Sequence, residues 1–294
     1  DGNIGGRSGK TYSHYRIMEE GLKFIRANKA KPFFCYFPIT PPHGMYDIPK
    51  DDPAWELYKG EKWIDNPAIG QDVKNYAAMV SMVAHNVGQV LDLLRELKLE
   101  DDTIVFFTGD NGGQDRFRSK KHPRGFFGPN VNPKTGVEFR GGKGNLYEGG
   151  LRIPYLVRWP GKIKAGTRSN LVGITMDLYP TACAAAGAKV PDHVRGKSLL
   201  PTMLGQAQKL DRDLVFVRRE GGLRYNGQDY HAFRRGDWKL VHNSPFEPYE
   251  LYNLKTDPLE QNDLAGSNRK KFTELAAPLR LHYQRAGRVP WQKP

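Results

Sequence analysis

Asp110 and Asn111 are an adjacent acid and amide whose oxygens could bind a metal ion. They follow the apolar run TIVFFT (residues 103–108) in the loop GDNGG. A carboxylate next to an amide oxygen, in a glycine-rich loop that a ligand can approach closely, supplies the hard ligands that Ca²⁺ and Mg²⁺ take. Asn-Gly is also the strongest two-residue hairpin signal. The residues after this loop show no returning strand, which argues against a simple hairpin.

Lys143, in GGKGNLYEGG (residues 141–150), and His43, in the turn ITPPHG, could both bind an oxyanion. An ammonium in such an open backbone lets neighbouring N–H groups approach the same anion. An imidazole can donate to an oxyanion or act as a general acid. Each has an ordinary alternative, because GGKG is also typical of a solvated turn and a His beside prolines is often packed or solvent-facing. The other seven His show no ligand-like spacing.

The familiar nucleophiles are missing from the sequence. It contains no G-x-S-x-G motif, the signature of a strained nucleophile turn. Cys35 lies in the apolar run PFFCYF and Cys183 in an alanine-rich segment, so both are interpreted as small buried hydrophobic residues. Two Cys in 294 residues also exclude a disulfide scaffold and a Cys-based zinc site.

The elements that must position these residues follow an α/β rhythm. Hydrophobic spacing predicts helices at 15–28, 72–97, 176–186 and 269–283, buried strands at 32–37, 103–108 and 153–159, and short strands at 214–218, 232–233, 238–241 and 250–254. In α/β sheets, ligands gather at the carboxyl ends of the strands, where His43, Asp110 and Asn111 fall. We therefore predict a larger α/β domain over 1–205 and a small antiparallel sheet with a closing helix over 206–294.

Five blocks in this order resemble the type I sulfatase family of the alkaline-phosphatase-like superfamily. They are PFFCYFPITPPHG, YAAMVSMVAHNVGQVLDLLRELKLEDDTIVFFTGDNGG, GGKGNLYEGGLRIPYLVRWPGKIKAGT, MDLYPTACAAAG, and the closing pair GDWKL with ELYNLKTDPLEQNDLA. The resemblance covers nearly the whole chain, and the second and third blocks are the specific ones. It implies an alkaline-phosphatase-like mixed sheet flanked by helices, followed by a small antiparallel sheet and helix.

The resemblance also implies a role for each candidate residue. Asp110 and Asn111 match the later pair of ligands for a Ca²⁺ or Mg²⁺ ion, Lys143 matches the sulfate-binding lysine, and His43 matches the histidine that contacts the sulfate and its bridging oxygen. The family nucleophile is a formylglycine hydrate that attacks sulfur. It is made by a formylglycine-generating enzyme from a Cys or Ser in a C/S-x-P/A-x-R motif. The metal, Lys and His would offset the developing negative charge.

The chain departs from this family pattern at the nucleophile. Neither Cys35 nor Cys183 is followed by x-P/A-x-R, and the family's N-terminal Asp pair and downstream Lys and His block have no counterpart. We therefore expect the chain to match the C-terminal portion of a sulfatase, to be inactive alone, and to expose apolar surface. The resemblance further implies export to the periplasm or exterior.

The net charge of +13 indicates an anionic partner. Residues 116–168 hold 13 Lys plus Arg and two Glu, so 13 − 2 = +11 falls in this basic segment, which would attract a sulfated small molecule or glycan. Two alternatives are a phosphate or phosphonate ester hydrolase of the same superfamily and a non-catalytic protein that binds sulfated glycans. We expect no nucleic-acid partner, because no recognition motif accompanies the charge, and no membrane span, because no apolar run approaches the roughly 20 residues it needs.

Overall fold

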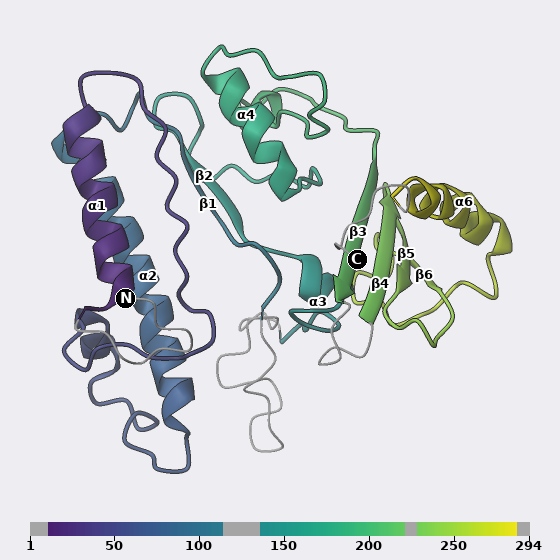
Figure 1. Ribbon diagram of the computed structural model, residues 1–294, viewed down its shortest axis with the longest axis horizontal. Helices are drawn as coiled ribbons and strands as arrows, with labels where there is room; N and C mark the ends of the chain where they lie inside the picture. Colours follow the sequence, from purple (N-terminus) through teal and green to yellow (C-terminus); the bar gives the residue numbers. More distant parts are fainter. Residues whose placement is uncertain (1–10, 114–135, 221–227, 287–294) are drawn as a thin grey trace, which may run out of the picture. The chain divides into compact units, whose positions relative to one another are not determined.

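The computed structural model describes residues 11–113, 136–220 and 228–286. The chain divides into two compact units, Asp1–Val105 with Val157–Ala165 and Phe106–Leu156 with Gly166–Pro294. Helices and two separate sheets make up the described part, so the predicted α/β class is confirmed (Figure 1). The domain boundary predicted near residue 205 stays a prediction.

The first unit is organised around two helices, α1 (Ser13–Asn28) and α2 (Gln71–Glu96), which lie side by side (Figure 1). Their shared core contains Ile25, Leu93 and Leu94. Two polar contacts join the helices. The buried ring of His14 lies 2.7 Å from the Asn86 side-chain oxygen, and Arg26 donates to both carboxylate oxygens of Glu96. A short 3₁₀ helix, η1 (Pro53–Tyr58), interrupts the long loop before α2.

The apolar run at 32–37 is not the buried strand that the sequence predicts. It runs without a strand assignment, and its side chains alternate between the helix core and solvent. Phe33, Cys35 and Phe37 pack against the α1 and α2 core, whereas Phe34 and Tyr36 are 77% and 74% exposed. No described residues pair with the run as a neighbouring strand, so only one of its faces is buried. The expectation that this chain exposes apolar surface where further elements of a sulfatase would pack stays a prediction.

Among the described residues, α2 is the one helix with the length and apolar composition to cross a membrane. A core helix of a globular unit passes the same test. The buried side of α2 supplies Leu93 and Leu94 to the core that it shares with α1. This property of α2 is therefore weak evidence for a membrane span.

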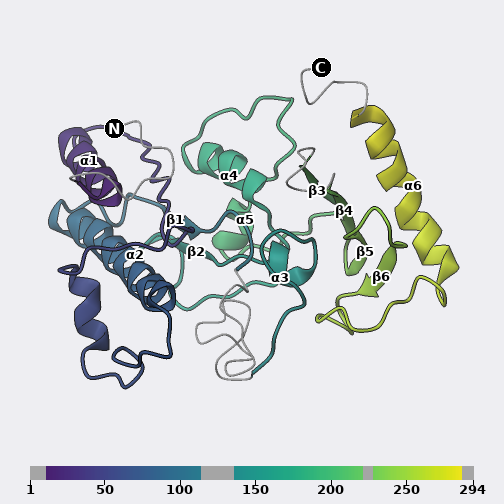
Figure 2. The same cartoon turned by 60° about the horizontal axis from the view of Figure 1, so that its bottom comes forward.

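Strands β1 (Val105–Thr108) and β2 (Tyr155–Arg158) form a two-stranded sheet and lie side by side (Figure 2). They replace the longer predicted strands at 103–108 and 153–159. The loop that carries Asp110 and Asn111 leaves the end of β1. The short helix α3 (Glu148–Leu151) lies just before β2 and follows the Lys143 loop.

A further part of the second unit surrounds the buried carboxylate of Asp177, between η2 (Thr175–Asp177) and α4 (Leu178–Ala185). Arg212 donates to both Asp177 oxygens, at 2.6 and 2.5 Å. The backbone N–H groups of Ile174 and Lys197 also donate to this carboxylate. These contacts fix α4 and the segment that leads to α5 (Leu200–Met203).

The C-terminal sheet has four antiparallel strands in the order β3 (Asp213–Glu220), β4 (Gln228–Arg235), β5 (Trp238–His242) and β6 (Glu250–Asn253). Helix α6 (Arg269–Ala286) packs on one of its faces (Figure 1). This arrangement confirms the predicted antiparallel sheet with a closing helix.

Strand alternation gives this sheet two buried faces. Toward α6 it presents Phe233, Leu240 and Leu251, which pack against α6 residues such as Leu275 and Leu279. The alternate residues Ala232, Val241 and Tyr252 pack on the opposite side with Leu146 and Tyr147. The second face of the sheet therefore supports the segment that carries Lys143.

Candidate functional site

The structure joins the Asp110 loop to the Lys143 loop through their backbones. The Lys143 N–H donates to the Gly113 carbonyl at 2.8 Å, and the Gly112 N–H donates to the Gly150 carbonyl at 2.8 Å. Two segments that lie about thirty residues apart in the sequence thereby form one local structure. Three of the four predicted site residues, Asp110, Asn111 and Lys143, lie on this structure.

Glycines allow the two loops to approach so closely. A Cβ on Gly112 would collide with the Gly149 carbonyl, and a Cβ on Gly149 would collide with the Gly141 carbonyl. Both obstacles are backbone atoms, which cannot rotate away as a side chain can. Gly144 has φ +105°, a conformation that glycine adopts far more readily than other residues. The glycine-rich sequence is therefore required by backbone contact.

The side chains of this double loop are accessible and suited to charged ligands. The Asp110 carboxylate is exposed, and its Oδ1 accepts from the Asn111 N–H at 3.0 Å. The Asn111 amide nitrogen donates to the Gly112 carbonyl at 2.8 Å. That bond leaves the amide oxygen to act as an acceptor or metal ligand. Two hard oxygen donors on adjacent residues fit a Ca²⁺ or Mg²⁺ ion. Such ions bind six or more ligands, and this pair supplies two of them. No group of three or more metal-binding side chains occurs among the described residues.

His43 lies in the first unit. Its N–H donates to the Thr40 carbonyl at 3.0 Å in a turn, and its side chain is exposed. Tyr46 anchors the loop, since its side chain is buried and its carbonyl accepts from the Asn75 amide at 2.8 Å. The Asp110 and Lys143 loops belong to the second unit. The convergence of His43 with Lys143 on one sulfate therefore stays a prediction.

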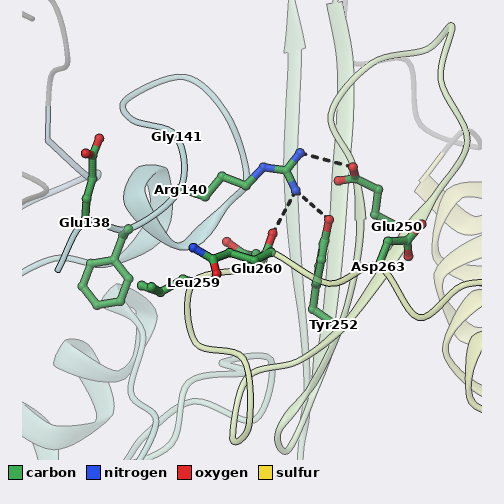
Figure 3. A pocket seen from close by; sticks show the side chains of 10 residues that line it. Glu138, Arg140, Gly141, Glu250, Tyr252, Leu259, Glu260 and Asp263 are labelled. Atoms are coloured by element: carbon green, nitrogen blue, oxygen red, sulfur yellow. Dashed lines mark hydrogen bonds and ion pairs between the residues drawn. The ribbon is translucent and has the colours of Figure 1, made fainter. Parts of the chain in front are cut away.

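Sequence reasoning missed the residues that hold the Lys143 loop, beginning with Arg140. Its guanidinium donates to the Tyr252 hydroxyl at 2.6 Å, to the Glu260 carbonyl at 3.0 Å and to the Glu250 carboxylate at 3.3 Å (Figure 3). The guanidinium carbon also lies 3.8 Å from the centre of the Tyr147 ring, in a cation–π arrangement. Arg140 thus connects the start of the loop to β6 and to the turn after it.

The second missed feature is a buried ion cluster at the end of the same loop. The Lys239 ammonium lies 2.9 Å from Glu148 and 2.8 Å from Glu260, and the side chains of Lys239 and Glu260 have 0% exposure. Glu260 also accepts from the Glu148 N–H at 2.6 Å, the first N–H of helix α3. Burial raises the pKa of Glu260, and Lys239 opposes this rise. A sequence signal existed, since Lys239 shares its strand face with the buried Val241.

An open pocket of about 680 Å³ lies beside Arg140. Figure 3 shows Glu138, Glu250, Glu260 and Asp263 around it. These carboxylates are largely engaged within the protein. Glu250 accepts from Tyr147 and Arg140, and Asp263 accepts from backbone N–H groups of 251 and 265. The pocket therefore belongs to the support of the Lys143 loop.

The basic segment 116–168 divides into two parts. Six of its cations lie outside the described residues: Arg116, Arg118, Lys120, Lys121, Arg124 and Lys134. Three of the others form ion pairs with carboxylates, because Arg140 pairs with Glu250, Arg152 with Glu148 and Arg158 with Glu100. Within the part of the segment that the structure describes, these ion pairs reduce the positive charge that could attract an anionic substrate.

Comparison with known families identifies the family of the chain. The model described as Sulfatase matches residues 3–188, and the model described as N-sulphoglucosamine sulphohydrolase, C-terminal, matches residues 142–286. The first covers more than half of the chain and includes both site loops. The chain belongs to the sulfatase family. The resemblance seen in the sequence is therefore confirmed.

Curated relatives include several sulfatases. The chain is 27% identical to human steryl-sulfatase over 88% of this chain and 45% of that protein. It is 29% identical to mouse N-acetylgalactosamine-6-sulfatase over 99% of this chain and 49% of that protein. It is 30% identical to a sulfatase of Formosa agariphila over 84% of this chain and 44% of that protein. The chain therefore spans about half the length of these relatives.

Solved structures support the same family fold. Ps i-CgsB superimposes with a TM-score of 0.74 at 28% identity, over 92% of this chain and 55% of that one. Ps i-CgsB has also been solved in complex with k-i-k-neocarrahexaose, which gives a TM-score of 0.73. A second protein, BT4656 in complex with its substrate D-glucosamine-2-N,6-O-disulfate, has a TM-score of 0.56 at 25% identity, over 78% of this chain and 44% of that one. The alkaline-phosphatase-like fold predicted from the sequence is confirmed.

Proposed function

We propose that this chain forms part of a sulfuric ester hydrolase that acts on a sulfated carbohydrate. The observation that carries the proposal is the backbone junction of the two loops, which brings a lysine and a pair of oxygen ligands into one structure. In this proposal Lys143 binds the sulfate, and His43 contacts the sulfate or the departing oxygen. Asp110 and Asn111 provide part of a metal site.

The proposed roles follow from the chemistry of each side chain. The Lys143 ammonium offers donors and a positive charge to sulfate oxygens as their negative charge grows. His43 can donate a hydrogen bond to the bridging oxygen as the alcohol departs. Asp110 and Asn111 present oxygen atoms that fit a Ca²⁺ or Mg²⁺ ion, with further ligands from elsewhere in the protein. When bound, such an ion would stabilise negative charge on the sulfate and on the nucleophile.

We place the nucleophile outside these 294 residues, because no C/S-x-P/A-x-R motif occurs in them. The free thiols do not replace it. Burial raises the pKa of Cys35, which disfavours the reactive thiolate, and Cys183 lies within α4. The chain alone would then be inactive, and the whole protein would need a formylglycine-generating enzyme. Family membership also supports export to the periplasm or exterior.

The substrate class rests on the relatives. One is named for N-acetylgalactosamine-6-sulfate, and two structural neighbours contain a neocarrahexaose and a disulfated glucosamine. A sulfated glycan is therefore the substrate we propose here, although a steroid sulfatase is also among the relatives. The charge of +13 favours a polyanionic ligand.

The test uses the full-length protein, coexpressed with a formylglycine-generating enzyme and checked for the modification by mass spectrometry. We expect sulfate release from members of a panel of sulfated sugars and aryl sulfates. Lys143→Met should abolish most turnover, whereas Lys189→Met, at an exposed position outside the basic segment, should leave it unchanged. Faster turnover of the matching phosphate esters would favour a phosphoesterase. Glycan binding without turnover of either ester would favour a non-catalytic binding protein.

The metal proposal has its own readout. Calorimetric titration of the metal-free full-length protein with Ca²⁺ should show binding that Asp110→Ala weakens strongly. Asp101→Ala changes an exposed carboxylate before β1 and serves as the matched control. Equal Ca²⁺ affinity in the two variants would remove Asp110 from the metal site.

A further inference from the structure

The sulfate-binding loop proposed above passes directly beside an arginine of the C-terminal sheet. The Arg218 guanidinium donates to the Gly144 carbonyl, and Gly144 follows Lys143 in the chain. A Cβ at Gly144 would collide with this guanidinium. The φ of +105° at Gly144 favours glycine at this position, and the missing side chain leaves room for Arg218 to reach the carbonyl.

The register of β3 explains why Arg218 reaches the loop. Side chains alternate between the faces of a sheet, so Arg218 shares its face with Phe216. Phe216 packs into the cluster that contains Leu146 and Tyr147, on the loop side of the sheet. Arg218 also lies over the ring of Tyr230, its cross-strand partner, at 5.8 Å.

Residue 143 is held from both sides by these contacts. Its own N–H donates to the Gly113 carbonyl in the loop of the metal pair. The next residue, Gly144, is held by Arg218 from β3. A little further along, the Leu146 N–H donates to the side-chain oxygen of Asn243, just after β5, at 2.8 Å. The backbone that carries the Lys143 ammonium is therefore fixed by the metal loop and by the C-terminal sheet.

We propose that Arg218 is a positioning residue for Lys143. Its charged hydrogen bond to the Gly144 carbonyl fixes the backbone from which the Lys143 side chain reaches the sulfate. This inference rests on the proposed function. A displacement of about 1 Å in a charge-stabilising group can cost on the order of 10²-fold in rate, so loss of Arg218 should reduce kcat/KM by about that factor.

Arg219 provides a matched control on the same strand. It points to the opposite face, where it donates to Asp229 at 2.8 Å. Arg218→Ala and Arg219→Ala each remove an arginine side chain that donates a hydrogen bond. Arg218 donates to the Lys143 loop, and Arg219 donates to the neighbouring strand. Arg218→Lys keeps the charge without the planar fork of donors and should fall between Arg218→Ala and the unchanged protein.

The first measurement needs no activity. Hydrogen–deuterium exchange of peptides covering residues 141–147 should become faster in Arg218→Ala and stay unchanged in Arg219→Ala, with equal melting temperatures. The second measurement is a double-mutant cycle in the full-length, formylglycine-containing protein. Arg218→Ala should cost about 10²-fold in kcat/KM when Lys143 is present, and less than about threefold when Lys143 is already Ala, because residues that act through one another are not additive.

Two results would overturn the proposal. One is unchanged exchange of the loop in Arg218→Ala. The other is an equal loss of kcat/KM with and without Lys143, which would mean that Arg218 acts independently of it. If Arg218→Ala melts lower, Arg218→Lys must still show the nonadditive loss with Lys143→Ala. If the full-length, formylglycine-containing protein without any substitution hydrolyses no sulfate ester, the proposed function is contradicted, while the exchange measurement still decides the role of Arg218.

Discussion

Removal of the buried Lys239 ammonium should destabilise the C-terminal sheet severely. In Lys239→Met the apolar stem of the side chain is largely kept, but Glu148 and Glu260 lose the cation that lies 2.9 and 2.8 Å away. Breaking a buried ion pair from one side costs about 3–5 kcal/mol, because it leaves an uncompensated charge in the interior. Domains are stable by only about 5–15 kcal/mol, so this is a large fraction of the total.

Urea denaturation of the chain, followed by tryptophan fluorescence, measures this loss. Trp238 precedes Lys239 in β5 and reports on the sheet. With an m value of about 2 kcal/mol/M, the predicted cost lowers the midpoint by about 1.5–2.5 M. Lys209→Met, at an exposed pair with Asp211, is the matched control and should leave the midpoint unchanged. Equal midpoints in the two variants would refute the reasoning.

The pH dependence tests the cause of the loss. Burial already raises the pKa of Glu260 above its ordinary value, and removal of Lys239 should raise it further. A carboxyl with a raised folded-state pKa stabilises the fold at acid pH and loses that contribution as pH rises. The deficit of Lys239→Met should therefore shrink as pH falls from 7 toward the ordinary carboxyl range. Adding Glu148→Gln and Glu260→Gln should recover much of the stability at pH 7, because no buried charge is then left unpaired.

Three further predictions concern stability. Burial lowers the pKa of His231 to about 4, although Asp229 lies 2.8 Å away and opposes the shift. As pH falls, the unfolded chain therefore binds a proton at this histidine before the folded chain does, and the free energy of unfolding should fall between about pH 6.5 and 4. In His231→Phe the urea midpoint should change less with pH over this range. Gly112→Ala should lower the melting temperature, because its Cβ would collide with the backbone of the second loop. Gly88→Ala, in open space within α2, should raise stability by about 0.4–1 kcal/mol, and a lower melting temperature for Gly88→Ala would contradict this account.

Hydrophobic periodicity in the sequence was sufficient to predict α2 and most of the C-terminal sheet. The stripe of α2 and the short apolar runs of β3, β5 and β6 gave bounds close to those observed, because each element buries the face that its own sequence marks. The run predicted at 232–233 marks only the buried centre of β4, which extends over Gln228–Arg235. The prediction of a buried strand at 32–37 was wrong, because it also relied on the local sequence alone. Its sequence is apolar on both faces, but burial of the second face needs a neighbour that the run itself does not specify.

The residues that support the site could not be read from local patterns. Arg140 meets Glu260 across 120 positions, and Lys239 meets Glu148 across 91. No short-range spacing relates such residues, so even the alternation that places Lys239 on the buried face of β5 does not name its partners. The chemistry-bearing residues of the double loop were easier to find, because acidic, amide and lysine side chains between glycines are unusual within a short stretch.

The long separation of these contacts has a consequence for how the protein is made. Residues 140–150 leave the ribosome well before 239–260, so the Lys143 loop cannot acquire its buried ion cluster until the C-terminal sheet has been synthesised. Contacts between distant positions also form slowly, because closing the intervening chain costs entropy first. We therefore expect the Lys143 loop to be among the last parts of the second unit to become ordered during biosynthesis. A premature stop before residue 260 would leave that loop unformed even though every residue of the loop itself had been translated.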